Sequence, residues 1–350
     1  MRFALTDDQI DFRDAVRALL ADRCPPEAVR TAWGGAVGHL VEGPKGGNGD
    51  GRVRGAWDAL AEMGVLGLLV PEQHDGLGMT DEDLVPLLIE CGRAGLPDPV
   101  SSTAGVAAAC LRDHASDDLA AAWLPRLASG SATIAVGFES SPLIPTAATA
   151  DAFLLARAGE VYLLEPSLVD LEPVESVDGA RALCRVNWEP VPDALVIGGD
   201  EGFVAAHQCF DRAALGAAAQ LIGLGHRMLD LTVEYVKERR QFGVPIGSFQ
   251  AVKHQLADAS LAVEFAEPLV HRGATSMALG DGDASTHVSM AKAKAGVAAL
   301  EAASVSLQCH GAIGYTVECD LHLFMKRSWA LAARYGDSGW HRARIRHALL

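Results

Sequence analysis

The sequence predicts a mainly α-helical protein with a small β-domain in the middle of the chain and a four-helix bundle at its C-terminal end. Apolar residues recur at helical spacing in the first third and in the final segments, whereas short β-favouring runs alternate with Gly, Pro and Asp turns between them. The 350 residues leave room for two to three domains of about 150 residues each. We expect an N-terminal helical domain over residues 1–127, a β-barrel-like domain over 128–202 and the bundle over 203–350.

The first third of the chain opens with an amphipathic helix. Thr6 is a candidate N-cap for this helix, and Pro25 and Pro26 are expected to stop it. A second helix should carry Trp57 and end at Gly64. Further helices are expected over residues 81–93, 102–114 and 118–127.

The middle segment and the final segment differ in their periodicity. Runs typical of β-strands occur at 133–136, 153–156, 161–164, 184–186 and 194–197. Helical spacing then returns, and four long helices with short connections are expected over 203–238, 249–279, 284–308 and 320–334. Pro268 lies inside the second of these helices and is expected to kink or split it.

Composition narrows the class of protein. With 49% hydrophobic and 21% charged residues, the chain is too apolar to be disordered and too often interrupted by charge to be embedded in a membrane. No apolar stretch approaches the roughly 20 residues of a spanning helix, and four aspartates among the first 14 residues argue against an export signal. A formal net charge of −16 argues against nucleic-acid binding. We therefore expect a cytoplasmic protein without membrane insertion.

Several metal-binding and catalytic patterns are missing. The seven cysteines are scattered without a Cys-x-x-Cys pair, which favours reduced and mostly buried thiols over disulfides or a zinc site. Neither H-E-x-x-H nor Glu-x-x-His occurs, so no metal site is expected. The histidines of the last third are expected on polar helix faces or against the core; they are His226, His254, His271 and His287.

Three further patterns are weak. The glycine-rich run 43–51 lacks the Gly-Lys-Ser/Thr ending of a phosphate-binding loop and follows no β-run, so we expect a flexible surface loop there. No G-x-G-x-x-G joins a β-run to a helix, which argues against a Rossmann-type dinucleotide site. The Gly-Asp-Ser-Gly tetrapeptide at 336–339 occurs in trypsin-like proteases, but here it lies in a helical region and is attributed to chance.

The most specific pattern lies between the first two long helices of the bundle. Residues 235–258 read YVKERRQFGVPIGSFQAVKHQLAD and put a guanidinium, an amide and an aromatic ring at a helix end, a combination suited to holding a pyrophosphate and stacking on a planar group. Taken alone, they leave open that Arg239 and Arg240 are solvated and that Phe242 belongs to the core. The segment closely resembles the signature of the acyl-CoA dehydrogenase family. Residues 308–316 (QCHGAIGYT) and 63–78 (MGVLGLLVPEQHDGLG) resemble two other segments of that family.

The resemblance implies a fold, a cofactor and a reaction. Members of this family have the same domain order and bind FAD without a covalent bond. They remove a proton from Cα and a hydride from Cβ of an acyl-CoA substrate, and electron-transfer flavoprotein accepts the electrons. Each FAD lies across a subunit interface. By this resemblance, the residues of the ADP end of FAD are Arg240, Gln241, Phe242, Gln308, Gly311 and Gly314.

The chain departs from the family at the catalytic base and in the β-domain. The usual glutamate position near the C-terminus is matched by Gly336, and the alternative position on the first bundle helix is matched by Ala213. A small shift in alignment leaves Asp337 and Asp211 as candidate bases. Residues 137–142 stand where the family has a stretch that faces the flavin ring and thioester, and they do not match it.

One hypothesis accounts for both departures. The chain resembles the non-catalytic subunit of the α2β2 enzymes that oxidise CoA thioesters of steroid side chains, and it would lend its ADP half-site to a homologous subunit that carries the base. Its shortness for the family, largely in the β-domain, fits this hypothesis. Two alternatives stay open: a homo-oligomeric dehydrogenase with a relocated carboxylate base, and a scaffold or binding protein of the same fold without flavin.

Overall fold

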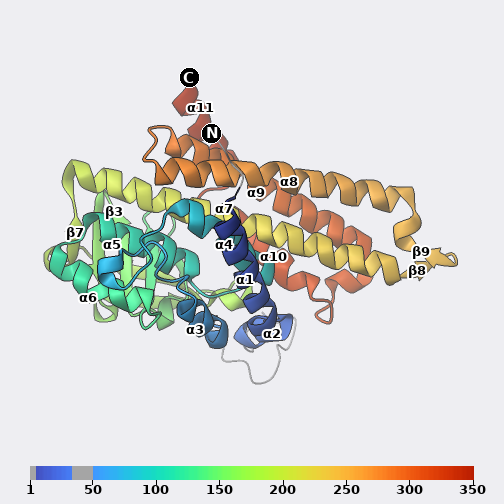
Figure 1. Ribbon diagram of the computed structural model, residues 1–350, viewed down its shortest axis with the longest axis horizontal. Helices are drawn as coiled ribbons and strands as arrows, with labels where there is room; N and C mark the ends of the chain where they lie inside the picture. Colours follow the sequence, from blue (N-terminus) through green and yellow to red (C-terminus); the bar gives the residue numbers. More distant parts are fainter. Residues whose placement is uncertain (1–4, 34–49) are drawn as a thin grey trace.

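The computed structural model describes residues 5–33 and 50–350 of the chain. Most of the glycine-rich run at 43–51 lies outside the described residues, so the expectation of a surface loop there stays a prediction. The described residues form N-terminal helices, two small sheets and a C-terminal helix bundle, in that order along the chain (Figure 1). The predicted fold class is confirmed.

The N-terminal helices begin where capping side chains precede them. Thr6 caps α1 (Asp7–Arg23) in a reciprocal capping box with Gln9, as the sequence predicted. Helix α1 ends at Arg23, just before Pro25 and Pro26, as predicted. Pro26 then begins α2 (Pro26–Trp33), because proline is favoured at a first helical position, where no N–H partner is needed. The remaining elements are α3 (Arg54–Glu62), α4 (Asp81–Ala94), the π-helical η2 (Ser101–Ala107), α5 (Ala108–His114) and α6 (Asp117–Ala128).

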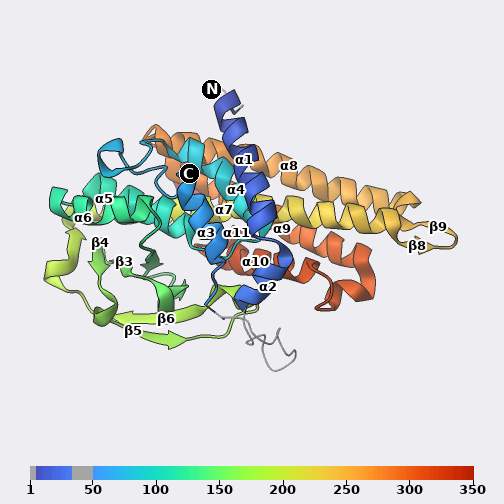
Figure 2. The ribbon, with the colours of Figure 1, turned by 60° about the horizontal axis from the view of Figure 1, so that its bottom comes forward.

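Seven strands follow in two sheets, which lie below the bundle in Figure 2. The four-stranded sheet has the order β1-β3-β4-β7, in which only β1 and β3 run parallel. Its strands are β1 (Ile134–Phe138), β3 (Ala152–Arg157), β4 (Glu160–Leu164) and β7 (Leu195–Ile197). The antiparallel second sheet has the order β2-β6-β5, with β2 (Leu143–Pro145), β6 (Leu183–Trp188) and β5 (Val169–Pro173).

Alternation along β3 divides the core into two parts. Phe153 and Leu155 point into a small core between the two sheets, whereas Leu154 and Ala156 join the large core formed with the helices. Strands β2 and β5 were not predicted, because each is short and carries too few apolar residues to be distinguished from a turn.

The bundle consists of α7 (Gly199–Glu238), α8 (Gln250–Ala278), α9 (Ala284–His310) and α10 (Leu321–Ala333), followed by α11 (Ser338–Leu349) against α9. Pro268 does not split α8, which stays helical along its length because it packs closely against α9. The α4 and α7 backbones approach so closely that a Cβ at Gly92 would lie 2.1 Å from the Gln220 carbonyl oxygen. This contact fixes α7 against the N-terminal helices. In the described residues, no helix is long and apolar enough to cross a membrane.

Candidate functional site

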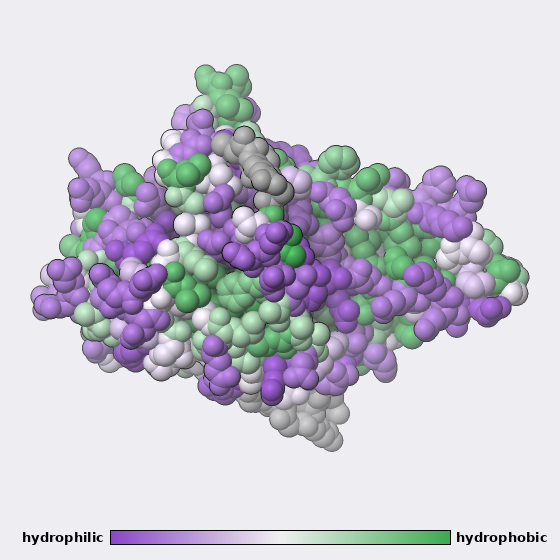
Figure 3. Space-filling model, in the orientation of Figure 1, coloured by the Kyte–Doolittle hydropathy of each residue, from purple (hydrophilic) through white to green (hydrophobic). Residues whose placement is uncertain are grey.

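The signature segment forms a hairpin that projects from one end of the bundle (Figure 1). Its strands are β8 (Arg240–Gln241) and β9 (Val244–Pro245), and its turn residues Phe242 and Gly243 have φ values of 51° and 80°. Positive φ at both positions is typical of the tight turn that matches the twist of a two-residue hairpin. The Phe242 ring is 93% exposed, so it does not belong to the core. Apolar residues reach the surface at this end of the molecule (Figure 3).

The second signature segment lies at the same end of the bundle. Gln308 is exposed in the last turn of α9, and Gly311 ends that helix with a φ of 65° and open space where a Cβ would stand. The Tyr235 ring stacks on His310 at 4.4 Å between centroids, which joins the end of α7 to the end of α9. The hairpin and the short helix η8 (Gly311–Tyr315) therefore extend from neighbouring helix ends.

Most of the residues expected at the ADP end of FAD are open to solvent in the single chain. Arg240, Gln241, Phe242, Gln308 and Gly311 are exposed. Gly314 is buried instead, because it packs against Leu307 and His310 beneath η8. These exposed side chains are free to contact a ligand or another chain.

The position of the expected glutamate base has no room for a side chain. Gly336 has a φ of 86°, and a Cβ there would lie 2.5 Å from the Trp340 ring and 3.0 Å from His341 Nε2. The Lys292 ammonium donates to the carbonyl oxygens of Ala332 and Gly336 at 3.0 and 2.9 Å. The segment is therefore fixed in a conformation that only glycine adopts without strain.

The two aspartates near the expected base positions are engaged in other contacts. Asp211, 2% exposed, accepts from the Arg344 guanidinium at 2.5 Å and from Ser285 Oγ at 2.5 Å. Asp337 is exposed, and its carboxylate accepts from the Trp340 backbone N–H at 2.8 Å as the N-cap of α11. Asp211 thus fixes α11 to α7, and Asp337 begins α11.

Aromatic rings gather around Phe138, in the 137–142 stretch that the resemblance assigns to the flavin ring. The ring centroid of Phe138, at the end of β1, lies 5.4 Å from that of Phe210 and 5.8 Å from that of Tyr335. The Phe210 centroid in turn lies 5.3 Å from that of Trp340. Edge-to-face packing of Phe138 against Phe210 and Tyr335 stabilises this cluster. Phe138, Phe210 and Trp340 also line a hollow of about 530 Å³. The sequence analysis did not identify Phe210 or Trp340, because they are far apart in the chain and neither belongs to a local motif.

The adjacent cleft is small. It lies between the 97–102 segment, the sheets, α7 and α10, and its volume is about 70 Å³. Ala213, at the alternative base position, and Tyr335 both line it. Ligand pockets are generally about 300–1,000 Å³, so an isoalloxazine ring does not fit in this cleft. The exposed residues of the hairpin fit the ADP end of FAD, whereas this particular cleft is too small for the flavin ring.

Burial lowers the pKa of two basic side chains beside Gly336, Lys292 and His341. Desolvation lowers the pKa of Lys292 to about 8, although Asp337 nearby acts in the opposite direction. Desolvation also lowers the pKa of His341 to about 4. His341 is fully buried, with Nε2 2.9 Å from the Tyr335 carbonyl oxygen. Both groups stabilise the loop between α10 and α11.

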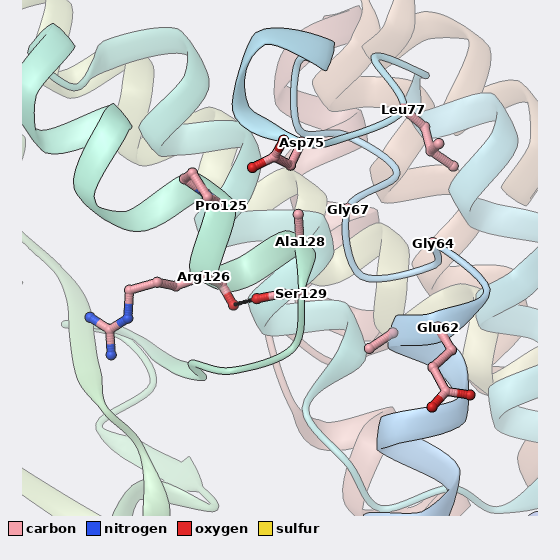
Figure 4. A pocket seen from close by; sticks show the side chains of 10 residues that line it. Glu62, Gly64, Gly67, Asp75, Leu77, Pro125, Arg126, Ala128 and Ser129 are labelled. Atoms are coloured by element: carbon pink, nitrogen blue, oxygen red, sulfur yellow. Dashed lines mark hydrogen bonds between the residues drawn. The ribbon is translucent and has the colours of Figure 1, made fainter.

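Another hollow lies elsewhere, between α3, α6 and the 63–78 segment (Figure 4). Its volume is about 470 Å³, and its lining includes Glu62, Asp75 and Arg126. These charged side chains point apart rather than toward one reacting centre (Figure 4). The hollow is at the opposite end of the molecule from the hairpin, so it does not belong to the surface that carries the signature segments.

Two of the histidines predicted on helix faces, His226 of α7 and His271 of α8, share one carboxylate partner on α8. His226 Nε2 lies 2.9 Å from Glu267 Oε2, and His271 lies 3.5 Å from the other oxygen of that carboxylate. The two imidazoles hold the pKa of Glu267 well below its usual range. Within residues 5–33 and 50–350, no three His, Cys, Asp or Glu side chains are grouped so that they could hold a metal ion.

The comparisons with known proteins identify the family. Residues 6–131 match the acyl-CoA dehydrogenase N-terminal domain, and residues 200–350 match the acyl-CoA dehydrogenase C-terminal domain. The chain is 32% identical over 333 residues to the acyl-CoA dehydrogenase IpdE2 of Mycolicibacterium smegmatis, covering 95% of this chain and 96% of that protein. The chain belongs to the acyl-CoA dehydrogenase family, whose members are FAD-dependent oxidoreductases.

Solved structures share the fold at low sequence identity. The ChsE4-ChsE5 complex of Mycobacterium tuberculosis contains a chain with a TM-score of 0.84 and 22% identity, covering 100% of this chain and 99% of that one. A variant of the steroid ACAD Tcur3481-Tcur3483 has a TM-score of 0.83 and 22% identity, covering 97% of each chain. These two likenesses bear on the fold alone.

Proposed function

We propose that this chain is the non-catalytic subunit of a heteromeric FAD-dependent acyl-CoA dehydrogenase. It supplies the surface for the ADP end of FAD to a homologous partner, which carries the flavin-ring pocket and the glutamate base. The observation that carries this proposal is the contrast between the two ends of the expected cofactor site. The ADP-end residues are open, whereas the expected base position is a glycine, at which a Cβ would lie 2.5 Å from the Trp340 ring.

The exposed hairpin supports an assembly of this kind. A phenylalanine ring 93% exposed at the tip of a hairpin costs free energy in water unless something covers it. The Arg240 guanidinium beside it makes only a 3.4 Å contact to the Gly243 carbonyl oxygen among the described residues, so its remaining N–H groups are available to a phosphate. An aromatic ring and an arginine together suit a nucleotide held between two chains.

The names of two structural neighbours support a proposal on the substrate class and the partner. The complex of ChsE4 with ChsE5 pairs two named chains, and the Tcur3481-Tcur3483 protein is described as a steroid ACAD. We infer an α2β2 assembly that dehydrogenates the CoA thioester of a steroid side chain and passes electrons to electron-transfer flavoprotein. FAD supplies the hydride acceptor when bound, and this chain contributes binding and orientation only.

A homo-oligomeric enzyme with a relocated base requires one of the two aspartates to reach a substrate. Asp211 is neutralised by Arg344, and Asp337 caps α11. Asp337→Asn distinguishes the two proposals, because it abolishes turnover if Asp337 is the base and leaves the heteromer's turnover unchanged if the partner carries the base.

The proposal is tested by variants of the hairpin in the complex formed with a co-expressed homologous subunit. Arg240→Ala should weaken FAD binding about ten- to a hundred-fold, because a hydrogen bond to a charged group contributes about 1.5–3 kcal/mol. The matched control is Arg185→Ala, which removes an exposed arginine from β6. Equal flavin content in the two variants would contradict the proposed role of the hairpin.

A further inference from the structure

The small cleft described above concentrates positive charge. Three arginines line it: Arg181 from the turn before β6, and Arg327 and Arg334 from α10. Two aspartates also line it, Asp98 and Asp178. Its walls thus carry more cationic than anionic groups, in a chain whose net charge is −16. The positive charge is therefore a local feature of this cleft.

Both aspartates are already neutralised by other groups. Asp98 accepts from the buried Arg52 at 2.5 Å and from the Val53 backbone N–H at 2.7 Å. Asp178 accepts from Arg327 Nε at 2.9 Å and from a backbone N–H. Asp178 still attracts Arg181 and so opposes the lowering of the Arg181 pKa, but among the described residues neither carboxylate forms an ion pair with Arg181 or Arg334.

Arg181 and Arg334 have no carboxylate within ion-pair distance among residues 5–33 and 50–350. Arg334 Nε is shielded from solvent and has no hydrogen-bond partner there, and its guanidinium lies 4.3 Å from the centroid of the Tyr335 ring. Burial and the two neighbouring arginines lower the pKa of Arg181 to about 10, and burial lowers that of Arg334. Two half-buried guanidinium ions side by side destabilise the fold unless an anion accompanies them.

We propose that this cleft is a binding site for one small tetrahedral oxyanion of the phosphate class, held by Arg181 and Arg334. The planar guanidinium groups donate pairs of N–H bonds to such an oxyanion. The cleft volume of about 70 Å³ accommodates a single small ion and excludes a nucleotide or a flavin. The α7 wall of the cleft carries the small apolar side chains of Ala213 and Ala217, so the arginines alone set the charge preference.

This site uses neither the hairpin nor η8, so the ADP end of FAD does not compete with it. An oxyanion there links η5 (Gly179–Arg181) beside the second sheet to the end of α10, next to the Tyr335–Gly336 segment. Occupancy therefore stabilises the closed arrangement of the β-region against the bundle.

Thermal unfolding of the full chain, alone and in the complex, tests the proposal. Potassium phosphate should raise the midpoint by a few degrees over potassium chloride of equal ionic strength, because a ligand that binds only the folded state stabilises it. The shift should disappear in the Arg181→Gln/Arg334→Gln double variant and persist in Arg185→Gln, which removes an exposed arginine of β6. In chloride alone, the double variant should be at least as stable as the native chain, because unpaired buried charge has been removed.

Three results would overturn the assignment. They are an equal midpoint in phosphate and chloride, a phosphate shift that survives in the double variant, and a larger shift with acetate than with phosphate, which would indicate a carboxylate ligand instead. As a second measurement, crystals grown with selenate should give anomalous density within hydrogen-bonding distance of Arg181 and Arg334. Density only at the surface would count against the site even if the variants fail to fold.

Discussion

Replacement of Gly336 by alanine tests whether the expected base position is closed. At a φ of 86°, any residue with a Cβ adopts the left-handed region at a cost of about 1–2 kcal/mol. The new methyl group would also stand 2.5 Å from the Trp340 ring. Overpacking of this kind costs about 1–3 kcal/mol. We therefore expect Gly336→Ala to lower the free energy of unfolding by about 2–5 kcal/mol.

Gly280 provides a matched control for the backbone contribution. Its φ is 61°, and nothing lies within 4 Å of the place where its Cβ would stand. Gly280→Ala therefore carries the left-handed backbone cost without a steric clash, and the difference between the two variants measures the clash. In urea, the midpoint of Gly336→Ala should fall further than that of Gly280→Ala, with an unchanged dependence of stability on denaturant.

Equal destabilisation in the two variants would refute the reasoning, because it would mean that Trp340 moves aside at little cost. In that case, a glutamate at position 336 could also be accommodated. If the clash is real, Gly336→Glu should unfold the loop between α10 and α11 without restoring a base. Dehydrogenation by the Gly336→Glu chain alone would contradict the closed position directly.

Three further predictions concern stability and assembly. Arg52→Leu should cost about 3–5 kcal/mol in urea unfolding, because it leaves the buried Asp98 carboxylate unpaired, and a cost below 1 kcal/mol would contradict this. The Lys292 pKa of about 8 lies below its unfolded value of 10.5, so the folded state releases its proton first, and stability should rise by about 3 kcal/mol between pH 8 and 10.5. That rise should be absent in Lys292→Met, and identical pH profiles would exclude the assignment. Phe242→Ser should leave the melting temperature of the single chain unchanged but reduce the flavin content of the complex, whereas Val177→Ser, a change at another exposed apolar residue, should alter neither.

The sequence predicted the parts of the fold that depend on local signals. Thr6 marks the beginning of α1 through its capping side chain, and apolar spacing marks the long bundle helices. Both signals come from residues that are close together in the chain, as does the contiguous signature around Phe242. Helix α11 was not predicted, because the alternating Arg and His residues of 338–349 give little amphipathic contrast. The Asp337 N-cap was the signal that could have located its beginning.

The closed end of the site could not be read from local patterns. Phe138, Phe210 and Tyr335 come together only when β1, α7 and the end of α10 pack, and no spacing in the chain encodes that meeting. The same is true of Arg181 and Arg334, which lie on different elements and become a pair only through tertiary packing. The family resemblance matched the expected base position to Gly336, but only the folded structure shows that Trp340 lies where a Cβ there would point.

Flavin stoichiometry tests the central claim most directly. The chain should be purified alone and together with a co-expressed homologous subunit, and the bound FAD should be measured by absorbance per mole of protein chain. The account predicts little FAD in the chain alone and one FAD per two chains in the active complex. One FAD per chain, together with dehydrogenation of an acyl-CoA by the single chain, would contradict it.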